Sequence, residues 1–471
     1  MLLAAVLGSS LAMLDATVVN IALPQIGADL GAEFSGLQWT VNGYTLTLAA
    51  LILLGGSLGD RFGRRRSFVV GTVWFAVASL LCGLAPNVEA LVAARMLQGV
   101  GGALLTPGSL ALIQASFRPG DRARAIGAWS GLGGVAAALG PFLGGTLVEL
   151  SWRLVFLVNL PFAALVVVVA LRHVPESFDA EMDPRIDVPG AALGALGLAG
   201  LTYGLVRIGD GIEPVGGVAL ALGVVGLAAF VAVERRSSHP MLPLEVFASR
   251  QFTAANLVTF LVYAALGAVF FLLVLHLQIV AGFTPLVAGL SLLPVTAAML
   301  LLSGRAGALT ERIGPRLPMT VGPLVCAVAL GLMLRIGSGS SYAVDVLPAV
   351  LLFGLGLSLT VAPLTATVLA AASTRHAGIA SGVNNAVARA AGLLAVAGLP
   401  VLAGISGDDF RDPEAFGAGF GVAMLVSAVL LALGGVLAAL TISNAEVVAA
   451  ARPARQSHCA VDGPPLHASR T

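Results

Sequence analysis

The fold class of this chain is decided by residues 56–66, GSLGDRFGRRR. The stretch places one acid and four arginines in a glycine-rich turn between two long apolar segments. A fainter copy, GALTERIGPR, returns at residues 307–316, and both copies read G-x-L-x-(D/E)-R-x-G-x-R. A charged turn that recurs far along an apolar chain predicts the two duplicated halves of a membrane transporter.

The composition requires a lipid environment. Of 471 residues, 58% are hydrophobic and 10% are charged, and the mean hydropathy is +0.97. A soluble protein of this length could not bury so much apolar surface, so we predict an all-α integral membrane protein. The arginines are scattered through short loops and the net charge is +1, so the sequence predicts no nucleic-acid partner.

The residues that an enzyme, a metal site or a bound cofactor would need are missing from the sequence. Cys82, Cys326 and Cys459 form no C-x-x-C motif and no cluster with histidine. The chain has no lysine and therefore no Walker-type loop for ATP. We expect a protein that is not an enzyme, with no metal and no cofactor.

Fourteen apolar runs are long enough to cross about 30 Å of hydrocarbon at helical rise. They are residues 3–23, 38–58, 67–86, 90–114, 125–147, 153–172, 188–207, 214–233, 252–280, 285–304, 317–336, 344–371, 378–404 and 417–441. We read the first run as a true span, because it is too long for a signal peptide and has no small-residue cleavage site.

The arginines orient these spans. With the N-terminus inside, nineteen arginines fall in cytoplasmic loops and the tail, and four fall in outer loops. Because positive loops stay in the cytoplasm, we expect both termini to be cytoplasmic.

The chain divides near its middle at a polar segment, residues 172–187. We predict an N-terminal six-helix bundle over 1–172, linker loops with two inserted transmembrane helices over 173–251, and a C-terminal six-helix bundle over 252–441. The segment 442–471 is rich in Ala, Arg, Pro and Ser and is predicted to be a disordered cytoplasmic tail.

Further motifs follow one another in order along the predicted helices. They are LDATVVNIALP at 14–24, LVAARMLQGVG at 91–101, GPFLGG at 140–145, and Trp152-Arg153 with Phe156, Asn159 and Pro161. Together with residues 56–66 they resemble the major facilitator superfamily, and within it the fourteen-helix drug:proton antiporters of EmrB/QacA type. The resemblance spans residues 3–441; Ala136 replaces the usual leading glycine of the fifth-helix motif.

The resemblance implies a major facilitator fold, with two six-helix bundles plus an inserted helix pair. It implies an exporter of hydrophobic or amphipathic drugs or antibiotics that is driven by the proton gradient and works by alternating access. The expected partners are a small amphipathic molecule, protons and the lipid bilayer of the cell inner (cytoplasmic) membrane, and we expect a monomer. A transporter of the same fold for a defined metabolite, such as a siderophore or an amino acid, stays open as the alternative.

Asp15 and Arg95 are the candidates for proton coupling or substrate binding. Asp15 is the only carboxylate well inside a predicted span, and an intramembrane acid is costly enough to indicate function. At helical rise Asp15 lies about 13 Å from Pro24, and Arg95 about 8–10 Å from the outer end of its span. The two are therefore expected in the same outer half. The alternative makes Asp15 a hydrogen-bonded helix lock and Arg95 a tie to backbone carbonyls.

The candidate gating loop consists of Gly56, Asp60, Arg61, Gly63 and Arg64. Most of its positive charge serves membrane topology, which requires neither the acid nor the glycines. An acid beside cations at a helix end can latch two bundles in one conformation. The resemblance implies that this latch closes an inner gate and favours the outward-open state.

The antiporter motif contributes Gly140, Pro141, Gly144 and Gly145. A helix breaker among small residues permits a kink and close backbone contact. We expect one helix to rock against another here, with static packing as the alternative.

A central cavity is expected between the halves, mostly apolar with few polar anchors. Asn385 and Arg389, at i and i+4, share one helix face and either line this cavity or bond neighbouring helices. The single deep acid, Asp15, would suit a cationic cargo or serve protons alone. The possible cavity residues are Gln98, His276, Gln278, Asn384, Asn385 and Arg389.

Overall fold

A computed structural model describes residues 2–116, 129, 132, 139–178, 187–211, 213–237, 240–371, 377–407 and 409–444. These residues form helices and connecting turns, and no strand occurs among them. The prediction of an all-α membrane protein is confirmed, because thirteen of the described helices are long and apolar enough to cross a membrane. The predicted tail lies outside the described residues from 445 onward.

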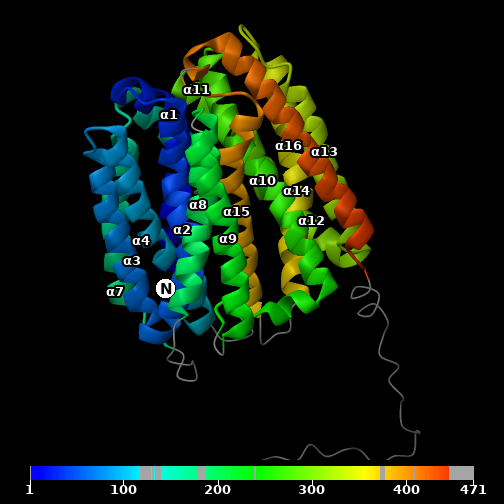
Figure 1. Cartoon of the computed structure of the whole chain (residues 1–471). Coiled ribbons are helices and arrows are strands. Elements are labelled where there is room, and N and C mark those ends of the chain that lie inside the picture. Colours follow the sequence, from blue (N-terminus) through cyan, green and yellow to red (C-terminus); the bar gives the residue numbers. More distant parts are fainter. Residues whose placement is uncertain are drawn as a thin grey trace, which may run out of the picture.

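The N-terminal half runs from α1 to α7 and fills one side of the molecule, in blue to cyan (Figure 1). Its helices are α1 (Leu2–Leu30), α2 (Phe34–Phe62), α3 (Arg64–Gly83), α4 (Val88–Ser116), an apolar helix over Leu139–Leu150, α6 (Leu154–Leu157) and α7 (Asn159–His173). The predicted fifth span, 125–147, falls mostly outside the described residues, and Leu139–Leu150 is its described part.

The C-terminal half fills the other side (Figure 1). Its helices are α10 (Arg250–Ile279), α11 (Pro285–Leu290), α12 (Leu293–Ile313), α13 (Arg316–Met333), η2 (Tyr342–Val346), α14 (Leu347–Ala370), α15 (Ala377–Leu402), η4 (Asp409–Arg411) and α16 (Pro413–Thr441). The single predicted span 285–304 is two helices, because Pro294 at the start of α12 has no N–H to continue α11.

A helix hairpin of α8 (Val188–Gly209) and α9 (Glu213–Arg236) lies between the two halves in the sequence. Glycines at 197, 200, 204, 216 and 223 let the two backbones touch, since a Cβ at Gly200 would lie 2.8 Å from the Cα of Gly223. α8 packs on both α2 and α15, and the rings of Trp39 and Tyr203 lie 6.1 Å apart across the first of these contacts. The short segment η1 (Leu244–Ala248) leads into α10.

The two copies of the charged turn occupy the same end of the molecule, which we call the loop end. Gly63 and Gly314 have φ of 113° and 86°, a region that favours glycine and explains why both copies carry one there. Each turn is held by the end of its own half. Arg65 N donates to Oε1 of Glu176 at 3.0 Å, and Arg316 N donates to Oδ1 of Asn444 at 3.1 Å. The duplication read from the sequence therefore extends to how each turn is fastened.

The opposite end is closed by contacts between the halves. Gln38 Nε2 donates to the carbonyl oxygen of Val396 at 2.7 Å, and Gln278 Nε2 donates to that of Ile21 at 3.1 Å. Phe34 N donates to the Gly407 oxygen at 3.0 Å. At the loop end, no hydrogen bond or ion pair joins the halves within the described part of the chain. Among the described residues, the hydrogen bonds that join the two halves therefore lie at this opposite end.

Candidate functional site

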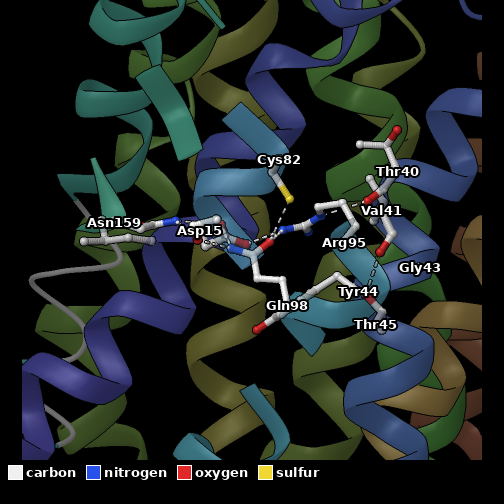
Figure 2. Close-up of polar contacts among 12 residues, drawn as sticks. Asp15, Thr40, Val41, Gly43, Tyr44, Thr45, Cys82, Arg95, Gln98 and Asn159 are labelled. Carbon is white, nitrogen blue, oxygen red and sulfur yellow. Dashed lines mark hydrogen bonds and ion pairs between the residues drawn. The ribbon is translucent and has the colours of Figure 1, made fainter. Parts of the chain in front are cut away.

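A polar network is buried inside the N-terminal half, with Asp15 of α1 at its centre (Figure 2). Arg95 Nη1 of α4 lies 2.5 Å from Asp15 Oδ2. Oδ1 accepts two further hydrogen bonds, from Gln98 Nε2 at 2.8 Å and from Asn159 Nδ2 at 2.9 Å. Asp15 and Arg95 are each 1% exposed. Asp15 and Arg95 were expected to lie in the same outer half of the N-terminal bundle, and the structure brings them into direct contact.

Arg95 is held on every side by its own half. Its Nε donates to the Thr40 carbonyl oxygen at 3.0 Å and its Nη1 to Gln98 Oε1 at 2.6 Å. The guanidinium lies over the ring of Tyr44, 4.5 Å from the centroid. The predicted structural role, a tie to a backbone carbonyl, and the ion pair with Asp15 are both present.

Gln98 belongs to this network, which corrects its expected place in the central cavity. It follows Arg95 by three residues on α4, so both side chains project to the same face. Ser79 of α3 joins through its hydroxyl, which accepts from Gln98 Nε2 at 2.7 Å. Asn159 was expected only as part of a motif, because nothing in the chain order shows that the start of α7 faces Asp15.

A small void of about 10 Å³ lies beside Asp15. It is lined by Leu143 and Leu147 of the Leu139–Leu150 helix and by Asn159, among others. A void of this size is just large enough for about one water molecule. The helix with the antiporter motif thus forms part of the immediate surroundings of the buried acid.

The antiporter-motif residues place that helix against both halves. A Cβ at Gly140 would collide with Thr17 of α1, and one at Gly144 would lie 3.0 Å from Val18 and Ile21 side chains. A Cβ at Gly145 would lie 2.5 Å from the Cα of Leu286 in α11. The Pro141 carbonyl similarly leaves no room for a side chain at Gly289 of α11. These contacts belong to the closed end.

A separate cavity of about 510 Å³ lies between the halves. It extends from Leu369 and Ser381, near the loop-end termini of α14 and α15, to Val41 and Val396 near the closed end. Its described polar lining includes Asn20, Asn42, Thr45, Asn384, Asn385 and Arg389. Asp15 is not among the lining residues.

Asn385 and Arg389 line the cavity, which was the first of the two alternatives given for them. Asn384 lines it and also bonds a neighbouring helix, donating to Thr259 Oγ1 of α10 at 2.8 Å. His276 and Gln278 do not line it, which corrects their expected place. His276 is 2% exposed, with Nε2 2.8 Å from the Ile336 oxygen and its ring stacked 3.8 Å from that of Phe420. It sits too far toward the closed end of α10 to reach the cavity.

In the gating loop, Arg64 Nε at the start of α3 lies 2.7 Å from Asp60 Oδ1 at the end of α2, across the turn at Gly63. Arg61 lies over the ring of Phe62 at 5.0 Å. Gly56 packs on Pro107 of α4, with a Cβ there at 3.6 Å. The partner that the sequence did not reveal is Glu176, whose Oε2 lies 3.7 Å from Arg65 Nε. All these contacts stay within the N-terminal half, and no described residue of the C-terminal half forms a hydrogen bond or ion pair with this loop.

The family model described as Major Facilitator Superfamily matches residues 5–396. The chain belongs to the major facilitator superfamily. A crystal structure of a D-xylose-proton symporter has the same fold, with a TM-score of 0.68 and 15% identity over 95% of this chain and 98% of that one. This major facilitator fold confirms the predicted architecture class.

Two relatives show which branch of this superfamily the chain is similar to. The Multidrug resistance protein Stp of Mycobacterium tuberculosis is 38% identical over 82% of this chain and 72% of its own length. The Tetracenomycin C resistance and export protein of Streptomyces glaucescens is 36% identical over 87% of this chain and 77% of its own length. The resemblance to drug-exporting major facilitator proteins is confirmed, and the family is one of transporters rather than enzymes.

Because Asp15 and Arg95 form a buried pair, we expect the stability losses of their single variants to be coupled. Arg95→Gln removes the cation that pairs with Asp15, and breaking a buried pair costs about 3–5 kcal/mol of unfolding free energy. Asp15→Asn should cost less, because Arg95 keeps Thr40, Gln98 and Tyr44. The double variant should lose less than the sum of the two single losses. Unfolding in mixed micelles, followed by tryptophan fluorescence, measures all three, and strict additivity of the losses would show that the pair is not coupled.

Proposed function

We propose that this chain is a proton-coupled exporter of amphipathic drugs or antibiotics that works by alternating access across the cytoplasmic membrane. The observation that carries the proposal is the separation of two sites. A buried Asp15–Arg95 pair lies inside one half, and a cavity of about 510 Å³ lies between the halves. One site suits a proton and the other a small molecule, while the names of the relatives supply the export direction.

The loop end is proposed to face the cytoplasm, because it carries the arginine-rich turns. Both termini are then cytoplasmic, and the described conformation is open to the inside. A reporter fused to the C-terminus and active only in the cytoplasm checks this orientation. Because both halves that enclose the cavity belong to one chain, a monomer is sufficient for transport.

Proton coupling follows from what protonation does to the network. The Asp15 carboxylate accepts hydrogen bonds from Arg95, Gln98 and Asn159 at once. A proton on the carboxyl cancels the charge that holds Arg95 and converts one acceptor into a donor. The tie between α1 and α4 weakens as a result. In the inward-open conformation the pair is intact, so the proton has already been released and the cavity is ready for cargo.

When the tie between α1 and α4 weakens, movement of α1 would affect both the cavity and the closed end. Asn20 on this helix lines the cavity, while Thr17, Val18 and Ile21 pack on Gly140 and Gly144 of the antiporter motif. A tilt of α1 therefore disturbs the contact between Gly145 and α11 that closes the outer end. The tight glycine contacts leave no space for water, and so limit proton leak.

The gating loop is proposed to form its latch only in the other conformation. Asp60 is paired with Arg64 inside its own half here, with a side chain 31% exposed. When the loop end closes, the same carboxylate becomes available to the C-terminal half. An inter-half contact formed in one state alone biases the equilibrium toward that state.

Asp15→Asn is expected to abolish proton-driven transport. The amide keeps the shape of the site but can neither bind nor release a proton. Accumulation of cargo into inverted vesicles driven by a pH gradient should fall to background, while cargo exchange without a gradient should persist because the cavity is intact. Asp412→Asn is the matched control, since Asp412 caps α16 at the surface and asparagine caps equally well. Gradient-driven transport by Asp15→Asn at the wild-type rate would refute the coupling role.

Asp60→Asn is expected to slow turnover and to shift the resting population toward the inward-open state. The shift is read from labelling of Ile21→Cys, a site between Gly144 and Gly289 at the closed end, in a chain whose native cysteines are serine. Labelling from outside should decrease, because the outward-open state loses its latch. Glu245→Gln removes an exposed carboxylate at the same end and should leave labelling unchanged. Unaltered labelling in Asp60→Asn would mean that the loop serves topology only.

A further inference from the structure

Arg389 is a charged side chain placed deep in the cavity between the halves. It lies twelve residues after the start of α15 at Ala377, about 18 Å along the helix at helical rise. Among the described residues that line the cavity it is the one that carries a charge. Three residues later, α15 touches α10, where a Cβ at Gly267 would lie 2.6 Å from the Cα of Gly392. The backbone that carries Arg389 is thus fixed against the neighbouring helix.

Arg389 has no acid to pair with in the described part of the chain. Its Nε is buried and makes no hydrogen bond, and none of the observed ion pairs includes it. The carboxylate expected deep in the bundle, Asp15, has both oxygens engaged in the N-terminal half. The neighbours that interact electrostatically with Arg389 are the phenols of Tyr44 and Tyr263, which are uncharged at neutral pH.

Other polar atoms at the cavity are also without partners. The Asn42 side chain is 0% exposed, and neither its amide nitrogen nor its oxygen makes a hydrogen bond. Asn20 Oδ1 is likewise buried and unbonded. Buried charges and amides in proteins are normally paired, because an unpaired one is costly. A fixed cation, with an unbonded donor at Asn42 Nδ2 and unbonded acceptors at Asn20 and Asn42 Oδ1, therefore points to a missing anionic group that carries further polar atoms.

The rest of the cavity wall is aromatic and aliphatic. Tyr263, Phe270 and Phe271 of α10 line it together with Leu266 and Leu393. Such a wall takes a flat apolar body, while Arg389 offers a fork of donors that matches a carboxylate or a phenolate.

We propose that Arg389 is an anion-binding subsite of the cavity, and that the cargo is an amphipathic aromatic compound with an ionised acidic group. The acidic group pairs with the guanidinium, the aromatic body packs on α10, and Asn20 and Asn42 bond further polar atoms of the cargo. This inference rests on the proposed function and replaces the cationic cargo that a lone deep acid would favour. Asp15 does not line the cavity, and both of its oxygens are bonded inside the N-terminal half, so it is left to serve protons.

Binding of three probes with one aromatic frame tests the subsite. Anthracene-9-carboxylate, its carboxamide and anthracene-9-methylammonium are titrated into the purified full chain in lipid nanodiscs, with probe fluorescence as the readout. The carboxylate should bind about tenfold or more tightly than the carboxamide, because only the former makes a charge-assisted pair with the guanidinium. The ammonium probe should bind least.

Arg389→Gln should bring the carboxylate-to-carboxamide affinity ratio close to one, with the carboxamide affinity little changed. Arg389→Lys should keep the carboxylate preference in weaker form, since the charge remains but the donor fork is lost. Arg305→Gln is the matched control: Arg305 of α12 donates to the Leu301 oxygen of its own helix and does not line the cavity. It should leave the ratio at the wild-type value.

Three results would overturn the inference: tighter binding of the ammonium probe than of the carboxylate, a wild-type ratio in Arg389→Gln, or binding of none of the probes. Thermal unfolding of each variant shows whether it is folded. If Arg389→Gln is not folded, the weakened carboxylate preference expected of Arg389→Lys tests the subsite instead. Proton-driven efflux of the same probes from proteoliposomes is a separate measurement. Its failure with the binding pattern intact counts against the exporter function and not against the anion subsite.

Discussion

The ion pair between Asp15 and Arg95 is the interaction on which the rest of this structure depends. It joins α1 to α4, and through Gln98, Ser79 and Asn159 it also ties in α3 and α7. An ion pair taken out of water is costly unless its remaining hydrogen bonds are satisfied. Here they are satisfied, so a single proton has a large effect on how four helices are held together. The arrangement is a structural lock between helices, and the coupling role that we propose for it uses the same contacts.

The two halves also differ in their charged residues. In the part of the chain that the structure describes, the N-terminal half carries an ion pair that does not line the cavity, whereas the C-terminal half presents Arg389 without an acid. Tyr44 stands between them: its ring lies 4.5 Å from Arg95, and its phenol is an electrostatic neighbour of Arg389. The proposed proton site and the proposed cargo site are thus distinct, and both have Tyr44 as a neighbour.

The fold could be predicted from the sequence, because spans, repeated turns and ordered motifs are local signals. It also put Asp15 and Arg95 at a similar depth, since the depth of a residue follows from its distance to the helix end, and the structure adds their direct contact. It could not place Gln98, because a polar residue on a membrane helix faces either a cavity or a neighbour, and only the packing of α3 and α4 decides. Glu176 and Asn444 were missed for a related reason: each fastens a turn far away in the sequence. His276 was misplaced because it lies beyond the cavity-lining part of α10, toward the closed end, where its ring stacks on that of Phe420.

The central claim is that protons cross through Asp15 while cargo crosses through the cavity. It is tested most directly by running the exchange backwards in proteoliposomes with no pH gradient at the start, so that a cargo gradient alone has to move protons. A dye trapped in the lumen reports the pH. The account predicts that cargo flowing out of the lumen brings protons in and acidifies it with the wild-type chain, whereas Asp15→Asn lets cargo exchange with no pH change. Equal acidification by both proteins would contradict the account.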